Sequence, residues 1–402
     1  MKKLSFFLPF FLLLILVVLQ IHNFILFPVS RGFDALNHLD YVGYLRTNHS
    51  IPMAHEGWEL YQPPLYYLLL FPITNPLFIR FLNGFVFVGL LIAVFLFFKK
   101  ITKNTFLGII STVIIASLPV VIYSLPAISN ELFSGMIISF TIMYYVTFAK
   151  RFALFNQIIF GCLLGLSLLS KATSFVLLFC IIVDQIIQHK NNFVKLTKHL
   201  LVILGFVLII SGWFYIRNLL MYQNPFTTSV DFPKFHIVQG PGYRDIKFFT
   251  DISGFLSLDL FKAHHYSLWS GTYFSWFYDG HNVIVPVQAF SKAGALLVIA
   301  SVPLFLMFIF GLIKELSKKD KSYLMILYPI VLFLSYIAYT IKLPFYSSVK
   351  GVFLISSIIP FTYFVIRFLA PLKKYYVVFL MYMLFFVFIV VKNFWILKDW
   401  YN

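Results

Sequence analysis

Residues 154–188 read LFNQIIFGCLLGLSLLSKATSFVLLFCIIVDQIIQ, an apolar stretch whose single basic residue, Lys171, lies at its middle. A helix that crosses the hydrocarbon core of a membrane needs about 20 apolar residues, so this stretch is too long for one crossing. We therefore expect two short membrane helices that turn at Lys171. The turn reverses the chain, so it decides on which side of a membrane every later loop lies.

The composition of the whole chain agrees with a membrane protein. Of its 402 residues, 61% are hydrophobic and 11% are charged, and the mean hydropathy is +0.90. Soluble domains are only about half apolar and about a quarter charged. The sequence predicts an all-α, polytopic integral membrane protein, a single domain over residues 1–402 with about 11 transmembrane helices. Besides the pair at 154–188, apolar stretches lie near 4–27, 77–98, 106–124, 131–149, 200–216, 294–313, 323–341, 351–369 and 375–396.

Charges in the loops test this arrangement, because Lys and Arg accumulate on the cytoplasmic side of membrane proteins. With a cytoplasmic N-terminus every expected inner loop is basic, including the Lys-rich segment 314–321, and most acidic residues fall outside. Without the turn at Lys171, segment 314–321 would lie outside. We expect a multi-pass protein of the plasma or inner membrane. The formal net charge of +17 follows from these loops, so no nucleic-acid partner is expected.

Two long segments are expected on the external face: the first loop, residues 31–76, and the second loop, residues 217–293. Chemistry is expected here, because loops carry most functional residues. The helical spacing of apolar residues from 35 to 46, and a helix start after Pro63-Pro64, predict interfacial helices in the first loop. The second loop, with His264-His265 and the aromatic stretch 269–281, is a candidate acceptor site. Its aromatic residues suit either stacking on a sugar or packing at the membrane surface.

The first loop carries a candidate general base. Asp34, His38 and Tyr41 are spaced i, i+4 and i+7, so one face of a helix would present a carboxylate, an imidazole and a phenol together. Asp34 could instead cap the helix 35–46 by accepting a backbone N–H bond, which would weaken it as a base. The spacing alone leaves both interpretations open.

Other candidates lie at the outer ends of expected spans. Glu131 opens a span, either as a second site carboxylate or as a complement to the helix dipole. Lys171, Arg217 and Lys350 are either interfacial anchors or clamps for the phosphate of a lipid in the outer leaflet. The histidines and both cysteines show no metal-ligand spacing, so a metal site remains unknown.

The first loop resembles that of the GT-C superfamily of membrane glycosyltransferases, nearest to the protein-mannosyltransferase and lipid A aminoarabinose-transferase group. The resemblance is carried by FDALNHLDY at 33–41, GWE at 57–59 and YQPPLYY at 61–67, which includes Gln62. Further matches follow in chain order: SNEL at 129–132, GLSLLSK at 165–171, GWFYIRN at 212–218 and YQNP at 222–225.

The resemblance implies an enzyme that transfers a sugar from a polyprenyl-phosphate donor to a hydroxyl of a glycan, lipid or protein acceptor at the outer face. Asp34 would be the catalytic base of an inverting displacement, Glu131 the second acidic position near the donor phosphate, and Lys171 a basic position of the family. Ala35 departs from the pattern, because the family usually has a second acidic residue there. A divalent metal is therefore compatible with the resemblance but not required by it. The alternative function is a transporter or flippase of lipid-linked sugars.

Overall fold

The computed structural model describes residues 4–148, 153–235, 244–257, 267–280 and 288–401. Every regular element in these ranges is a helix, so the predicted all-α fold class is confirmed. The long helices are α1 (Leu4–Leu26), α4 (Pro76–Thr102), α5 (Thr105–Ser117), α7 (Asn130–Thr147), α8 (Leu154–Ser170), α9 (Ser174–His189), α10 (Phe193–Val207), α16 (Gln288–Leu316), α17 (Tyr323–Lys342), α18 (Ile358–Leu369) and α19 (Tyr376–Phe394). The shorter helices are α2 (Ala35–Asn48), α3 (Leu65–Leu70), α6 (Pro119–Ser124), α11 (Trp213–Tyr222), α12 (Ile246–Thr250), α13 (Ser253–Ser257) and α15 (Leu268–Phe277).

Seven helical segments in the described ranges are long and apolar enough to cross a membrane. They are Phe7–Leu26, Pro76–Thr102, Phe193–Tyr222, Lys292–Leu316, Tyr323–Lys342, Gly351–Leu369 and Lys373–Phe394. The chain is therefore a multi-pass helical membrane protein. Helices α5, α7, α8 and α9 lie at the other expected spans but do not reach the same length and apolarity, so the number of about 11 crossings stays a prediction.

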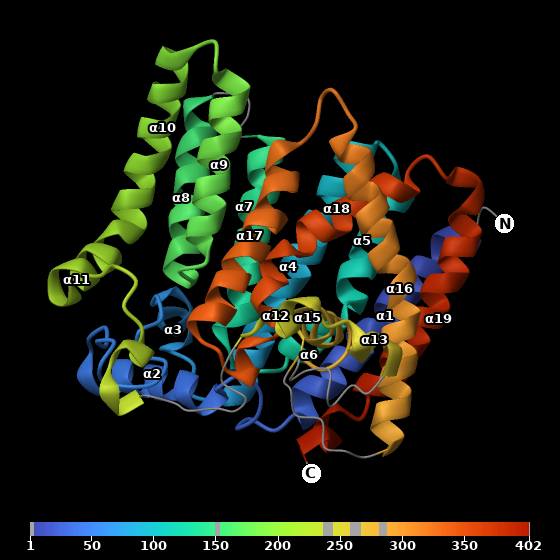
Figure 1. Cartoon of the computed structure of the whole chain (residues 1–402), viewed down its shortest axis with the longest axis horizontal. Helices are drawn as coiled ribbons and strands as arrows, with labels where there is room; N and C mark the ends of the chain where they lie inside the picture. Colours follow the sequence, from blue (N-terminus) through green and yellow to red (C-terminus); the bar gives the residue numbers. More distant parts are fainter. Residues whose placement is uncertain (1–3, 149–152, 236–243, 258–266, 281–287, 402) are drawn as a thin grey trace.

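The turn expected at Lys171 is confirmed. Helix α8 ends at Ser170 and α9 begins at Ser174, with Lys171 between them in an extended conformation. The turn is held by the Ser174 hydroxyl, which donates to the Ser167 carbonyl over 2.7 Å, and by the Lys171 N–H, which donates to the same carbonyl over 3.1 Å. Figure 1 shows α8, α9 and α10 as one group of long helices.

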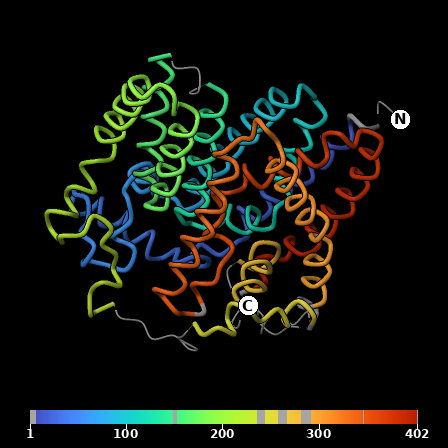
Figure 2. Tube along the Cα trace, turned by 45° about the horizontal axis from the view of Figure 1, so that its top comes forward, coloured from blue at the N-terminus to red at the C-terminus, as the bar shows by residue number. Residues whose placement is uncertain are grey.

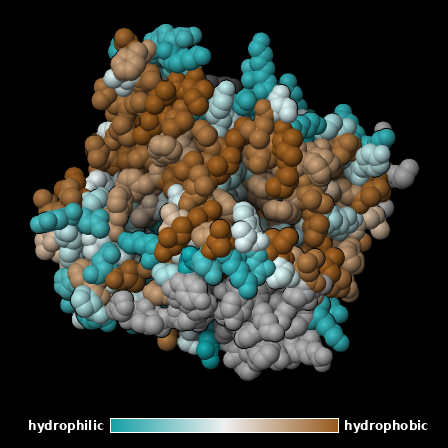
Figure 3. All heavy atoms as spheres, viewed as in Figure 1, coloured by the Kyte–Doolittle hydropathy of each residue, from teal (hydrophilic) through white to brown (hydrophobic). Residues whose placement is uncertain are grey.

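Different elements lie at the two ends of the helix bundle. Figure 1 places α2, α3 and α15 at one end, and the connections from α9 to α10 and from α16 to α17 at the opposite end. Between the ends, a broad band of hydrophobic side chains covers the visible face over α8–α10, α17 and α16 (Figure 3). This belt is what a lipid-facing surface requires.

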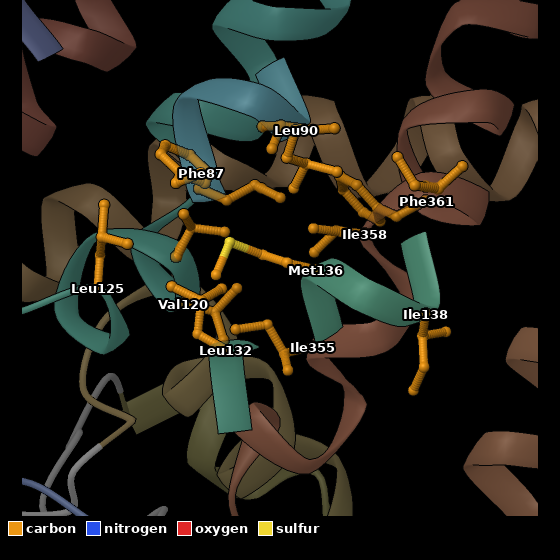
Figure 4. Close-up of a cluster of buried hydrophobic side chains, with 14 of the residues drawn as sticks. Phe87, Leu90, Val120, Leu125, Leu132, Met136, Ile138, Ile355, Ile358 and Phe361 are labelled. Carbon is orange, nitrogen blue, oxygen red and sulfur yellow. The ribbon is translucent and has the colours of Figure 1, made fainter. Parts of the chain in front are cut away.

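The interior is packed around α7. Met136 is fully buried and lies between Phe87 of α4, Val120 of α6 and Ile358 of α18 (Figure 4). A 3-10 segment, Gly351–Ser357, leads into α18 and packs on α7 through Ile355. The first and the last long helices also lie side by side, because α1 packs along α19 (Figure 2). This packing fixes the start of α7, which carries Glu131, relative to the rest of the bundle.

The expected helices of the first loop form as α2 and α3. Helix α2 buries Ala35, His38, Tyr41, Val42 and Leu45, and it packs against α3. Because these buried residues share one face of α2, that face packs on protein. The first loop is therefore held against the bundle.

Candidate functional site

A cavity of about 730 Å³ lies at the end of the bundle that carries the first loop. Its walls come from the start of α2, residues 58–63, the start of α7, the α8–α9 turn, α11, residues 225–230, α17 and the segment 343–353. Six of the sequence-predicted site residues line it: Asp34, His38, Gln62, Glu131, Lys171 and Lys350. The cavity therefore brings together side chains that the chain separates by up to about three hundred residues, at a size typical of small-molecule sites.

Asp34 is not a side-chain cap. It precedes α2 at the N-cap position, but its carboxylate accepts no capping hydrogen bond. Gly32, Phe33 and Asp34 follow one another with positive φ of 83°, 34° and 58°. Gly32 adopts this conformation without strain, whereas for Phe33 and Asp34 it costs about 1–3 kcal/mol each and persists only where the surroundings impose it. The left-handed turn leaves the Asp34 side chain exposed at the cavity wall, so the interpretation of Asp34 as a cap does not hold.

Glu131 and Lys171 form a salt bridge across the cavity wall. Ser129 caps α7 by accepting the Glu131 N–H over 3.1 Å, which leaves the Glu131 carboxylate to bind the Lys171 ammonium. Both side chains are only 13% exposed. The Lys171 ammonium also lies 5.8 Å from the centre of the Phe353 ring. Glu131 therefore acts through an ion pair and not only by facing the dipole of α7.

The predicted row of Asp34, His38 and Tyr41 does not form a connected group. His38 Nδ1 is 2.8 Å from the Tyr67 hydroxyl, and the Tyr41 hydroxyl donates to the Gln62 carbonyl over 3.3 Å. The Tyr41 and Tyr67 rings stack at 3.7 Å. Regular i, i+4, i+7 spacing fails because Asp34 lies outside the helix, in a left-handed conformation.

The ionisation of His38 and Tyr41 follows from their burial. Burial and the positive charge of Lys171 lower the pKa of His38 to about 3, so the imidazole is neutral. Burial raises the pKa of Tyr41, so the phenol keeps its proton. Both residues are thus uncharged supports of the first loop, with only His38 reaching the cavity among the described lining residues.

Gln62 connects the first loop to α7. Its amide donates to the Glu59 carboxylate over 2.8 Å and to the Tyr61 hydroxyl over 2.9 Å, and its oxygen accepts from Asn130 Nδ2 over 3.1 Å. Because Asn130 precedes Glu131, this network also sets the position of the salt bridge. Gln62 therefore orients neighbouring groups as well as lining the cavity.

Glu59 is a site residue that sequence reasoning quoted within a motif but did not select. It lines the cavity, yet its side chain is buried, and this burial raises the pKa of its carboxyl to about 8 against the opposing hydrogen bond from Gln62. The nearby charge of Asp34 raises the pKa further. A signal was present in the sequence, because Glu59 stands between the apolar residues Trp58 and Leu60.

Arg217 is beside the cavity and not among its described lining residues. Its guanidinium donates to the Ile51 carbonyl over 3.3 Å and to Asn218 Oδ1 over 3.1 Å, and it lies 5.0 Å from the Phe214 ring. These contacts fasten α11 to the first loop. Its position therefore favours a structural role over the predicted contact with a donor phosphate.

Lys350 lines the cavity beside the first residues of the first loop. Its ammonium lies 5.7 Å from the centre of the Phe33 ring, and within the described ranges it has no salt bridge. Burial lowers the pKa of Lys350, whereas the charge of Asp34 raises it. Lys350 is therefore a cation held close to Asp34 without a committed partner.

The second loop contributes less than expected in its described parts. Residues 225–230 line the cavity, whereas the Trp269 indole donates to the Phe249 carbonyl over 2.7 Å away from the lining. His264, His265 and His281 lie outside the described residues. In the described ranges no group of three His, Cys, Asp or Glu side chains could hold a metal ion.

Comparisons of the chain with protein-family models, with curated proteins and with solved structures found no match.

Proposed function

We propose that the chain is a membrane glycosyltransferase that moves a sugar from a polyprenyl-phosphate donor to a hydroxyl of a glycan, lipid or protein acceptor. The observation that supports the proposal is one cavity in which the uncapped carboxylate of Asp34 stands near Lys350 and the Glu131–Lys171 pair. A base beside cations is the set of groups that attack at a phosphate-linked carbon requires.

Asp34 is the proposed general base. It takes the proton of the acceptor hydroxyl while that oxygen forms a bond to the anomeric carbon. The bond between this carbon and the phosphate oxygen breaks at the same time, and its electron pair stays on the phosphate. Direct displacement of this kind inverts the anomeric centre. Positioned bases contribute about 10²–10⁴-fold in rate.

Lys350 and Lys171 are the proposed clamps for the departing phosphate. Lys350 has no salt bridge in the described parts of the chain, so its charge is available to the ligand. Lys171 already binds Glu131, so a phosphate would have to share it. We therefore assign the larger part of phosphate binding to Lys350, with Lys171 second and Arg217 as a support of the wall.

The proposed location is the external face of the plasma or inner membrane, with the N-terminus in the cytoplasm. This orientation rests on the basic loops, such as 314–321, which lie at the end of the bundle opposite α2 and α3. A polyprenyl tail would stay in the bilayer while its sugar enters the cavity. Acceptor selection is assigned to the second loop, whose residues 225–230 reach the cavity wall.

Proteoliposomes that contain the purified protein test the function. We expect radiolabel from a panel of polyprenyl-phosphate sugars to move onto acceptors supplied by membranes of cells that lack the protein. Label that crosses the bilayer but stays on the polyprenyl lipid would instead identify a flippase and contradict the proposal.

A further inference from the structure

One wall of the cavity is polar but carries no salt bridge in the part of the chain that the structure describes. It consists of Trp58, Glu59, Tyr61, Gln62 and Asn130. Side-chain hydrogen bonds centred on Gln62 join four of these residues. Trp58 adds an aromatic ring, whose edge-on contact with Phe235 at 6.2 Å steadies it. Neutral donors and acceptors beside an aromatic ring suit an uncharged, polyhydroxylated group better than a phosphate.

In this wall one carboxyl oxygen of Glu59 is hydrogen-bonded to a described residue and the other is not. Oε2 accepts the Gln62 amide over 2.8 Å. Oε1 accepts no hydrogen bond from any described residue. It is also not among the fully buried side-chain atoms that lack a hydrogen-bond partner. Glu59 lines the cavity, and Oε1 is the carboxyl oxygen that its described hydrogen bonds leave for a ligand there. A fixed carboxyl group with one free oxygen is thus presented to whatever occupies the cavity.

We propose that Glu59 is a sugar-binding residue, which hydrogen-bonds a sugar hydroxyl through Oε1 and so distinguishes a sugar-bearing lipid from the bare polyprenyl phosphate. The inference rests on the proposed function and names a subsite within it. The raised pKa, about 8, supports a donor role, because the carboxyl keeps its proton near neutral pH and then offers an O–H. A protonated acid also avoids repulsion from a nearby phosphate.

The charged and titratable groups that face Glu59 come from several elements. They are Asp34 before α2, Glu131 of α7, Lys171 of the α8–α9 turn, Tyr61 beside it, Tyr67 of α3 and Tyr339 of α17. Burial raises the pKa of Tyr61 and Tyr67, so these phenols keep their protons across the range in which Glu59 titrates. Loss of the Glu59 proton therefore turns a donor into an acceptor without a matching change in its phenol neighbours.

The test compares the affinity of the purified full-length protein for polyprenyl-phosphate mannose and for polyprenyl phosphate, at about pH 7 and about pH 9.5. We expect the preference of the wild type for the mannosylated lipid to fall about fivefold at the higher pH, the loss expected of one hydrogen bond. Glu59→Gln keeps an N–H donor at both values, so its preference should stay constant. The matched control is Glu56→Gln, at a carboxylate bound to Tyr44 and the Met53 N–H outside the cavity lining, and it should behave as the wild type does.

A wild-type preference that is independent of pH, or one that Glu59→Gln loses in the same way with rising pH, overturns the inference and leaves the proposed function standing. Failure of the wild type to bind either lipid overturns the proposed function and the inference with it. If Glu59→Gln fails to fold, the pH series is repeated with Lys350→Met, which removes the other lining group whose pKa is lowered toward this range. A preference of Lys350→Met that does not depend on pH then overturns the inference.

Discussion

The Lys171 ammonium binds the Glu131 carboxylate, and the two residues are 40 positions apart in the chain. Lys171 occupies the turn between α8 and α9, whereas Glu131 lies in the first turn of α7. The pair therefore ties the reversal of the chain to the cavity wall. Lys171, at which the sequence predicts the turn between two membrane helices, therefore also lines the cavity.

Breaking this pair should reveal a coupling between the two positions. We expect Lys171→Met and Glu131→Gln each to lower the free energy of unfolding in detergent, and the double variant to lose less than the sum, with a coupling of about 0.5–3 kcal/mol. The control pair is Lys342 and Asp231, 3.9 Å apart and more exposed, for which the coupling should be smaller. Strict additivity at positions 131 and 171 would contradict the salt bridge.

Lys350→Met tests the role of the Lys350 ammonium in phosphate binding. Loss of a charge-assisted contact is worth about 1.5–3 kcal/mol, so the affinity for polyprenyl phosphate should fall about 10- to 100-fold. Thermal stability should change little, because no salt bridge is lost within the described ranges. Lys342→Met is the matched control, since this side chain is 66% exposed and not in the described lining. Equal weakening by both substitutions would show a general effect of surface charge instead.

His38 should make stability depend on pH. Its pKa falls from 6.5 in the unfolded chain to about 3 in the fold, so between these values the unfolded state binds a proton that the folded state does not. Stability is therefore present above pH 6.5 and is lost as the pH falls, by about 1.4 kcal/mol per unit. From pH 7 to pH 5 the wild type should lose about 2 kcal/mol more than His38→Gln, measured by thermal or denaturant unfolding. Parallel curves for the two proteins would refute a neutral buried imidazole.

Close packing of α16 on α18 depends on Gly311. A Cβ atom at this position would lie 1.9 Å from the Phe364 carbonyl oxygen, so Gly311→Ala must push the helices apart. Overpacking of this kind typically costs about 1–3 kcal/mol, and we expect a lowered melting temperature in detergent. Gly205→Ala in α10 is the control, because nothing lies within 4 Å of its added Cβ. A normal melting temperature for Gly311→Ala would mean that the helices do not cross so closely.

Much of the fold was predictable because hydropathy is a property of local sequence. The stretch 154–188 predicted two helices with a turn at Lys171, and α8 and α9 confirm it. The seven span-length helices also lie where apolar stretches predict them. The π-helical turn at Leu208–Gly212 was not predictable from periodicity, because an inserted residue leaves the apolar run unbroken.

The sequence predicted which residues line the site better than it predicted which of them contact one another. Asp34, Glu131 and Lys171 were selected from sequence and line one cavity. Helical spacing wrongly joined Asp34 to His38 and Tyr41, because periodicity does not reveal that the residues before α2 turn left-handed. Arg217 bonds the Ile51 carbonyl across the fold, a contact that no local pattern reports. The elevated pKa of Glu59 likewise depends on burial by distant segments.

Asp34 is the proposed base of sugar transfer, and the transfer rate of Asp34→Asn in proteoliposomes measures this role. We expect the transfer rate to fall at least about 100-fold with little change in donor affinity, because the amide keeps the shape of the carboxylate but accepts no proton. Asp40→Asn, at an exposed carboxylate of α2 outside the described lining, should transfer at the wild-type rate. Equal transfer by Asp34→Asn and the wild type would show that Asp34 is not the base.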